Sequence, residues 1–260
     1  MIFLYRVVTN FLYPILIFLI YLRKIKGKEH QYRYKEKIFV KNFNVLKTSN
    51  SKLIWFHAAS IGELKSIIPV LEELNKRKEN LEFLITTVTL SSSIIAKEEL
   101  KKIKNAKHRF FPIDVNFVIK KFISLWKPDA IFLVDSEIWP NLILCAKEKK
   151  IPLGLLNARI TNKSFKKWKL IDQFAVKIFS AFDICISSNL ETSKYLESFK
   201  AKNIINSGNL KLVGKISIEK IKNINENLLS KKRFWFAAST HKGEDNFCFQ
   251  THLRLKAKFE

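Results

Sequence analysis

Short apolar runs alternate with longer amphipathic segments through most of this 260-residue chain, and this alternation constrains the fold more than any other feature. The predicted strands are residues 53–57, 82–87, 109–111, 130–134, 152–156, 183–187 and 203–206. The predicted helices between them are residues 63–78, 91–104, 117–126, 139–149, 165–179 and 191–199. Strands that alternate with helices form βαβ units, so we expect an α/β, Rossmann-like domain with a parallel sheet. Ligand sites in such sheets lie at the carboxyl ends of the strands.

A nearly continuous apolar stretch covers Ile2 to Leu22, and a run of basic residues follows it at once. As one helix it reaches roughly 30 Å, the thickness of a bilayer core. Flanking basic residues usually stay on the cytoplasmic side, and no small-residue cleavage site for a signal peptide follows. Its apolarity argues against a buried core helix. Arg6 and Asn10 weaken a membrane span, so spanning and interfacial helices remain alternatives.

The net charge of +24 arises from 47 Lys and Arg residues against 23 Asp and Glu residues. A field of this sign attracts anions such as phospholipid head groups or phosphorylated substrates. The basic residues are spread along the chain without a nucleic-acid-binding motif, so nucleic acid is not an expected partner. The three cysteines form no CxxC pair, and neither a disulfide framework nor a zinc site is expected.

Two predicted strand ends carry carboxylates. The strand at 53–57 leads into the HAASIGE segment, whose small residues let the backbone approach a ligand. Glu63 ends this segment and is either a first-turn residue that stabilises the helix dipole or a catalytic base, and spacing alone favours the first role. The strand at 130–134 ends in Asp135-Ser136-Glu137. These side chains suit proton handling or hydroxyl binding, or else Ser136 or Asp135 forms a helix N-cap.

Further polar loops follow later strands. Arg159 comes after the strand at 152–156 and either binds a carboxylate or phosphate or is solvated. A Gly-Asn turn precedes Lys211, which places one cation near a sheet edge. Residues 233–238 are predicted to form another strand and residues 243–259 another helix. The small-residue turn between them suits a phosphate. One strand and one helix cannot bury a core alone, so this unit either packs on the first domain or begins a second one.

Taken in order, these motifs resemble those of the 3-deoxy-D-manno-octulosonic acid (Kdo) transferase family. The matching segments are HAASIGE, SEIWPNLI, NAR, GNLK and AASTHKGE, and the N-terminus with Tyr5-Arg6 and Gly27-Lys28-Glu29 resembles the family's opening. The resemblance covers essentially the whole chain. It departs at residues 86–93, which read TTVTLSSS where the family often has Pro-Thr-Gly.

The resemblance implies a GT-B glycosyltransferase, in which two Rossmann-like domains face each other. The N-terminal domain binds the acceptor and the C-terminal domain binds the nucleotide sugar. It implies transfer of Kdo from CMP-Kdo to a lipid A precursor with inversion and without a metal or other cofactor. It also implies a place on the cytoplasmic face of the inner membrane.

The expected organisation has five parts. They are a membrane-anchor segment (1–24), a basic connector (25–52), an acceptor-binding Rossmann-like domain (53–213), a linker (214–232) and the start of an incomplete nucleotide-sugar-binding domain (233–260). One alternative is a catalytically inactive, membrane-attached, acceptor-binding fragment without a donor domain. Another is a basic, membrane-associated nucleic-acid binder, which salt-sensitive binding unaffected by CMP would favour.

The resemblance also assigns roles to residues. Glu63 becomes the general base, which takes a proton from the acceptor hydroxyl. Acceptor binding is assigned to Ser60, Gly62, Glu137 and Arg159. Without a metal, the departing CMP phosphate needs fixed positive charge. Donor binding is accordingly assigned to Lys211, Ser239, Thr240 and His241.

Overall fold

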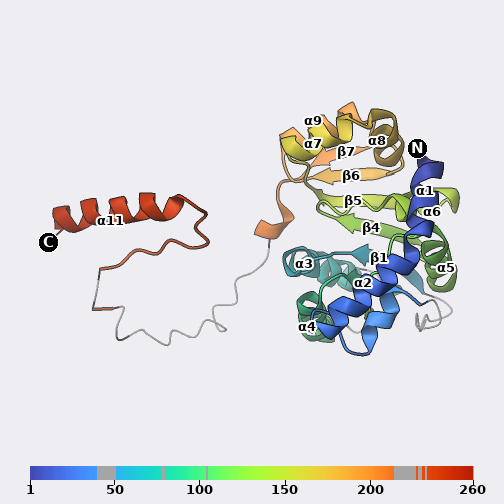
Figure 1. Ribbon diagram of the computed structural model, residues 1–260, viewed down its shortest axis with the longest axis horizontal. Helices are drawn as coiled ribbons and strands as arrows, with labels where there is room; N and C mark the ends of the chain where they lie inside the picture. The colour runs from blue at the N-terminus through green and yellow to red at the C-terminus, as the bar shows by residue number, and fades with distance from the viewer. Residues whose placement is uncertain are drawn as a thin grey trace. The chain divides into compact units, whose positions relative to one another are not determined.

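The computed structural model describes residues 1–39, 51–77, 80–103, 105–213, 227, 230–231 and 233–259 (Figure 1). The chain divides into two compact units, Met1–Gly214 and Lys215–Glu260. Each unit is described by itself. The described residues of the first unit contain a seven-stranded sheet, and those of the second contain one long helix.

All seven strands of the first unit are parallel and form one sheet in the order β3-β2-β1-β4-β5-β6-β7. The strands are β1 (Lys52–His57), β2 (Leu81–Thr87), β3 (Ala106–Phe110), β4 (Ala130–Val134), β5 (Leu153–Ala158), β6 (Ile184–Ser187) and β7 (Ile204–Asn206). Every predicted strand of this unit is present, although β3 begins three residues earlier than expected. The strand order reverses between β1 and β4, which is the Rossmann arrangement. The expected α/β fold class is therefore confirmed.

The connecting helices lie where the sequence predicts them, with one exception. They are α3 (Ile61–Arg77), α4 (Leu90–Glu99), α5 (Asn116–Trp126), α6 (Pro140–Glu148), α7 (Asn162–Lys169), α8 (Asp172–Phe179) and α9 (Leu190–Ser198), with short 3₁₀ turns η3 (Leu100–Lys102) and η4 (Leu210–Leu212). The single helix predicted at 165–179 is wrong, because it divides into α7 and α8. The break lets Phe165 stack on Tyr195 of α9 while Phe179 stacks on Phe199.

Alternate residues along the strands supply the two faces of the core. Trp55 belongs to the cluster formed with α5, α6 and α8, and Phe56 belongs to the cluster formed with α3 and α4. Gly154 in β5 permits a close approach, because a Cβ atom there would lie 2.5 Å from the ring of Phe132. That ring stacks on Phe56 of β1, with centroids 5.1 Å apart. The core therefore spans both faces of one continuous sheet.

The apolar N-terminus forms two helices, α1 (Ile2–Phe11) and α2 (Tyr13–Ile25), which meet at a 52° bend. Pro14 lies in the first turn of α2 and has no N–H, so it cannot donate the backbone hydrogen bond that would continue α1 into α2. Among the described residues, no helix by itself has the length and apolarity needed to cross a bilayer, whereas α1 and α2 meet that criterion only as a bent pair.

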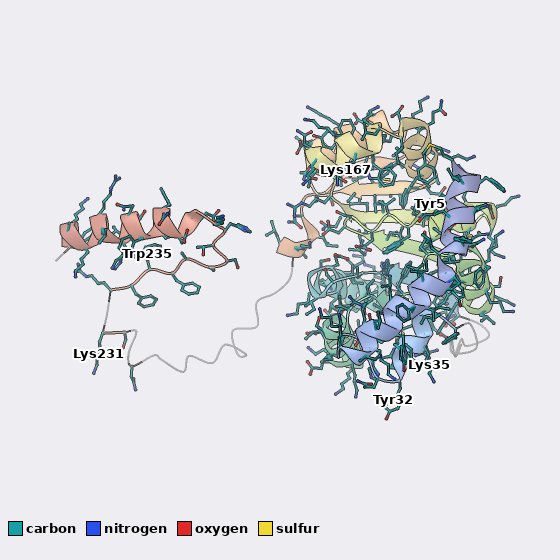
Figure 2. All side chains as sticks on the ribbon, in the orientation of Figure 1. Tyr5, Tyr32, Lys35, Lys167, Lys231 and Trp235 are labelled. Carbon is teal, nitrogen blue, oxygen red and sulfur yellow. The ribbon has the colours of Figure 1, made fainter. Side chains whose placement is uncertain are left out.

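Both helices lie along the sheet domain, as the blue ribbon in Figure 1 shows. Tyr5, labelled in Figure 2, donates a hydrogen bond from Oη to Asp114 at 3.0 Å. Arg6 forms an ion pair with Glu148 at 2.5 Å. Arg6, which interrupts the apolar stretch, therefore faces the sheet domain and has an ionic partner there. Large apolar side chains on the helices are exposed, namely Phe3, Leu4, Val7, Val8, Phe11, Leu12, Ile15, Phe18, Leu19 and Ile25.

The described residues of the connector hold α2 against the sheet through ion pairs and a hydrogen bond. They contain one 3₁₀ turn, η1 (Arg33–Lys37). Lys37 is buried and pairs with Glu29 at 2.5 Å, and its ammonium also donates to the carbonyl of Val88 at 2.8 Å. Arg23 at the end of α2 donates to the same Glu29 at 2.8 Å. Residues 40–50 of the predicted connector, and most of the predicted linker at 214–232, lie outside the described residues.

The second unit contains α11 (Glu244–Phe259), which confirms the helix expected at 243–259. The strand expected at 233–238 is wrong, because these residues form no strand in the structure. A strand requires a hydrogen-bonded neighbour, and the described residues of this unit supply none. Trp235, labelled in Figure 2, shares a hollow with His252 and Lys256 of α11. Phe234 and Phe236 beside it are exposed.

Candidate functional site

The strand order places the candidate site at one edge of the sheet. β1 and β4 are neighbours, but the chain leaves them toward opposite sides of the sheet, so their carboxyl ends form the switch point where ligands bind in such folds. Glu63 follows β1, and Asp135 and Glu137 follow β4. The charges of both β4-loop carboxylates act on Glu63. The structure therefore brings the two predicted acidic loops together.

Glu63 caps its own helix and also has the properties of a base. Ser60 Oγ donates to Glu63 Oε1 at 2.8 Å and accepts from the Glu63 N–H at 3.3 Å, while the Ala59 N–H donates to Oε2 at 2.7 Å. The Ser60 hydroxyl thus forms the N-cap half of a capping box, whereas the Glu63 carboxylate accepts from the N–H of Ala59 instead of that of Ser60. Burial raises the pKa of Glu63, as do the charges of Glu137 and Asp135, although the hydrogen bonds from Ser60 and Ala59 oppose the rise. A raised pKa makes the half-buried carboxylate a stronger base.

Gly62 leaves the surface beside this carboxylate open. It stands in the first turn of α3, and no atom lies within 4 Å of a Cβ built on it. Any larger residue would project into this open space next to Glu63. The small-residue turn expected from HAASIGE is thus present at the N-terminal end of α3, beside the Glu63 carboxylate.

Glu137 lies against buried aromatic residues. Its Oε2 accepts a hydrogen bond from Trp139 Nε1 at 2.8 Å, and His57 Nε2 lies 3.4 Å from the same oxygen. His57 is fully buried, and its ring stacks on Phe111 with centroids 3.8 Å apart. Glu137 is consequently held in one orientation at the end of β4.

The helix after β4 is capped from elsewhere in the chain. The alternative in which Ser136 or Asp135 forms this N-cap is wrong, because no side chain at the expected position caps α6. Instead, Asp114 accepts from the N–H groups of Asn141 at 3.0 Å and Leu142 at 2.9 Å. Burial raises the pKa of Asp114 to about 6. The loop that carries Glu137 is thereby fixed by a carboxylate that follows β3.

The GNLK segment folds onto the same edge. Asn157 is buried at the end of β5 with a φ of 55°, and its Oδ1 accepts from the Leu210 N–H at 2.8 Å. Lys211 Nζ then forms an ion pair with Asp135. Asp135 itself has a φ of 63°, a left-handed conformation that Asp tolerates better than most residues. Lys211, predicted to face the donor, therefore lies at the switch point.

Arg159 lies on the rim of this edge. Its side chain is exposed, and its carbonyl accepts a hydrogen bond from Ser136 Oγ at 2.7 Å. The contact ties the loop after β5 to the loop after β4. Arg159 is thus close to the two acidic loops in the fold and open to solvent.

The other predicted donor residues, Ser239, Thr240 and His241, belong to the second unit. All three are exposed in the turn before α11, and Ser239 has a φ of 55°. The His241 N–H donates to the carboxylate of Glu244 at 2.8 Å. They share one turn, and their position is described only within that unit.

Sequence reasoning missed three residues that shape the site: His57, Asp114 and Asn157. Each follows or ends a predicted strand, which is the one signal that would have singled them out. Their partners lie 27 to 109 positions away along the chain and come within contact distance only once the sheet has formed, so spacing along the chain does not reveal them. Among the described residues, no group of three or more His, Cys, Asp or Glu side chains is placed to hold a metal ion.

This seven-stranded parallel sheet, with its polar loops at the β1/β4 switch point, defines an α/β protein of the Rossmann-like, GT-B type. Solved structures agree at the level of the fold. A UDP-GlcNAc 2-epimerase from Neisseria meningitidis matches with a TM-score of 0.50 at 16% identity, over 70% of this chain and 55% of that one. A putative UDP-N-acetylglucosamine 2-epimerase from Listeria monocytogenes gives a TM-score of 0.51 at 15% identity, over 68% and 51% of the two chains.

Sequence comparisons identify the family. Residues 32–213 match the model of the 3-deoxy-D-manno-octulosonic-acid transferase (kdotransferase) family, so the chain belongs to this family. A probable mitochondrial 3-deoxy-D-manno-octulosonic acid transferase of Arabidopsis thaliana is 35% identical over 97% of this chain and 57% of its own length. The Rickettsia bellii transferase is 33% identical, over 97% and 60%. The chain spans little more than half the length of these relatives.

Proposed function

We propose that this chain serves in the transfer of Kdo from CMP-Kdo to a lipid A precursor, with inversion at the anomeric carbon, in lipopolysaccharide core biosynthesis. The observation that carries the proposal is the position of Glu63. Its half-buried carboxylate lies at the β1/β4 switch point, beside two further acidic residues that raise its pKa. Membership of the Kdo transferase family supports the identity of the sugar.

In the proposed reaction, an acceptor hydroxyl attacks the anomeric carbon of Kdo from the face opposite CMP. Glu63 takes the hydroxyl proton as the new C–O bond forms, and the bond to the CMP phosphate breaks with its electron pair. A well-placed base of this kind contributes about 10²–10⁴-fold. Ser60 and Ala59 hold the Glu63 carboxylate, while Gly62 leaves room for the acceptor beside it.

Positive charge for the leaving phosphate comes from protein groups in this proposal. Lys211 is one candidate, and it would exchange its ion pair with Asp135 for the phosphate. The turn with Ser239, Thr240 and His241 is the other candidate, because its N–H groups precede a helix N-terminus. Glu137 and Arg159 serve acceptor binding through the hydroxyl and anionic groups of the lipid A precursor.

The N-terminal helices supply the membrane attachment in this proposal, and they lie in the interface. Arg6 pairs with Glu148 of the domain, so the charge that weakens a span has a partner outside the lipid. The apolar side chains listed above for α1 and α2 remain exposed. Between the segment after α2 and α4, a pocket of about 380 Å³ is lined by three cationic side chains, Arg33, Lys97 and Lys101, together with His30, Ser93, Ile94 and Glu98. Anionic head groups favour such a flank, which suits the cytoplasmic face of the inner membrane.

The alternative is an acceptor-binding protein that does not use CMP-Kdo. It is favoured by one observation: none of the α11 residues is buried within the second unit. Two measurements on membranes that contain this chain separate the possibilities. Incorporation of labelled Kdo into a lipid A precursor supports the transferase, whereas precursor binding without incorporation supports the alternative. Failure of both would contradict the proposed function.

A further inference from the structure

His57 is a fully buried histidine at the carboxyl end of β1, and the proposed reaction gives it no role. Its ring stacks on Phe111, and its Nδ1 lies 3.0 Å from Thr86 Oγ1 and 3.2 Å from the Thr86 carbonyl oxygen. Thr86 Oγ1 in turn accepts a hydrogen bond from Trp55 Nε1 at 2.8 Å. One side of the imidazole is therefore fixed by the neighbouring strand β2.

The other ring nitrogen points at the candidate site. Nε2 is buried and has no hydrogen bond within the described residues, and Glu137 Oε2 lies 3.4 Å from it. An imidazole nitrogen and a carboxylate oxygen that face each other repel unless a proton lies between them. When Nδ1 donates to the Thr86 carbonyl, that proton belongs to the His57–Glu137 pair as a unit. Trp139 Nε1 donates to the same carboxylate oxygen and limits its movement.

We propose that His57 is a positioning residue for Glu137, which fixes this carboxylate beside Glu63, shares a proton with it and so sets the negative charge that Glu63 experiences. The proposal rests on the proposed role of Glu63 as the base. It adds a buried group that acts on the base through a second carboxylate.

The charges around the pair make this coupling specific. Burial is the largest cause of the raised pKa of Glu63, and the negative charges of Glu137 and Asp135 raise it further. Asp135 is already matched by its ion pair with Lys211. Asp114, whose pKa burial raises, is the other carboxylate that interacts electrostatically with His57. Glu137 is thus the acidic neighbour of Glu63 whose charge depends on a buried proton.

The pH dependence of kcat/KM tests the proposal in His57→Gln, Glu137→Gln and the double variant. A glutamine at position 57 retains a hydrogen-bonding amide but cannot share an acidic proton. We expect the acid limb to move to higher pH in His57→Gln and to lower pH in Glu137→Gln, each by up to about one unit. The double variant should match Glu137→Gln, because His57 acts only through Glu137. An unchanged acid limb in His57→Gln, or shifts that add, would overturn the proposal.

A second measurement does not depend on Kdo transfer. ¹⁵N NMR of the full chain with labelled histidine resolves the ring nitrogens of five histidines, and His57 is assigned by its absence in His57→Gln. We expect the His57 Nε2 signal to move in Glu137→Gln while the signals of His30 and His108 stay. If the Nε2 signal does not move, the His57–Glu137 pair is refuted whatever the catalytic activity. The Glu137→Gln protein gives this result even if His57→Gln folds poorly, because assignment can then rest on the other four histidines.

Discussion

Glu63 takes part in hydrogen bonds at the start of α3, and we propose that it also serves as the base, two roles that its position in the sequence leaves as alternatives. Ser60 accepts from the Glu63 N–H and donates its hydroxyl to the Glu63 carboxylate, which lies beside the acidic residues of the β4 loop. The same hydrogen bonds that cap α3 therefore orient the carboxylate toward the switch point. A cap and a base do not exclude each other when the helix begins at the ligand-binding edge of the sheet.

Ser60→Ala tests how the cap adjusts the base. The hydrogen bond from Ser60 lowers the pKa of Glu63, so its loss should raise that pKa and move the acid limb of kcat/KM to higher pH. Loss of an N-cap side chain also costs about 1 kcal/mol of stability. Rate profiles and thermal unfolding measure the two effects. An acid limb at or below the wild-type position would show that the Ser60 hydroxyl does not act on Glu63.

Asp114 gives the fold a pH-dependent stability. Its pKa is raised from 3.8 to about 6 by burial, so its contribution is fully present below pH 3.8 and is lost as the pH rises through 6. This loss amounts to no more than about 3 kcal/mol, at roughly 1.4 kcal/mol per pKa unit. Between pH 7.5 and pH 4.5, the midpoint of urea unfolding should change less in Asp114→Asn than in the wild type. Equal slopes in the two proteins would contradict the assignment.

At the scale of elements, the alternation of apolar runs predicts the sheet and most of its helices, because buried parallel strands read as short apolar segments. Two predictions fail for physical reasons. The apolar pattern at 165–179 is that of one continuous helix, but packing of Phe165 on Tyr195 of α9 divides the segment into two helices. The apolar segment at 233–238 has strand composition but no neighbour to pair with among the described residues.

The helix pair α1–α2 carries the membrane prediction. Phe3 and Phe11 are 81% and 80% exposed, so Phe3→Ser/Phe11→Ser should leave the fold intact. Burial of each phenyl ring in lipid is worth about 1.5–3 kcal/mol, so binding to anionic vesicles should weaken at least tenfold. Flotation measures this effect. Leu170→Ser is the matched control, because Leu170 is 85% exposed between α7 and α8. Equal loss in the control would contradict an interfacial role for α1–α2.

At the scale of the whole molecule, the sequence motifs meet at one edge of the sheet. The HAASIGE, SEIWPNLI, NAR and GNLK segments are far apart in sequence, and all four follow strands whose carboxyl ends form one edge. Parallel topology alone makes this convergence predictable. The buried connections of His57, Asp114 and Asn157 were not predictable, because each depends on which loops meet across the edge.

The most direct measurement is Kdo transfer to a lipid A precursor by wild type, Glu63→Gln and Glu72→Gln. Glu72 is an exposed residue of the same helix and serves as the matched control. The account predicts that Glu63→Gln binds the precursor but loses at least about 100-fold in turnover, whereas Glu72→Gln matches the wild type. Wild-type turnover by Glu63→Gln would contradict the placement of the base at the β1/β4 edge.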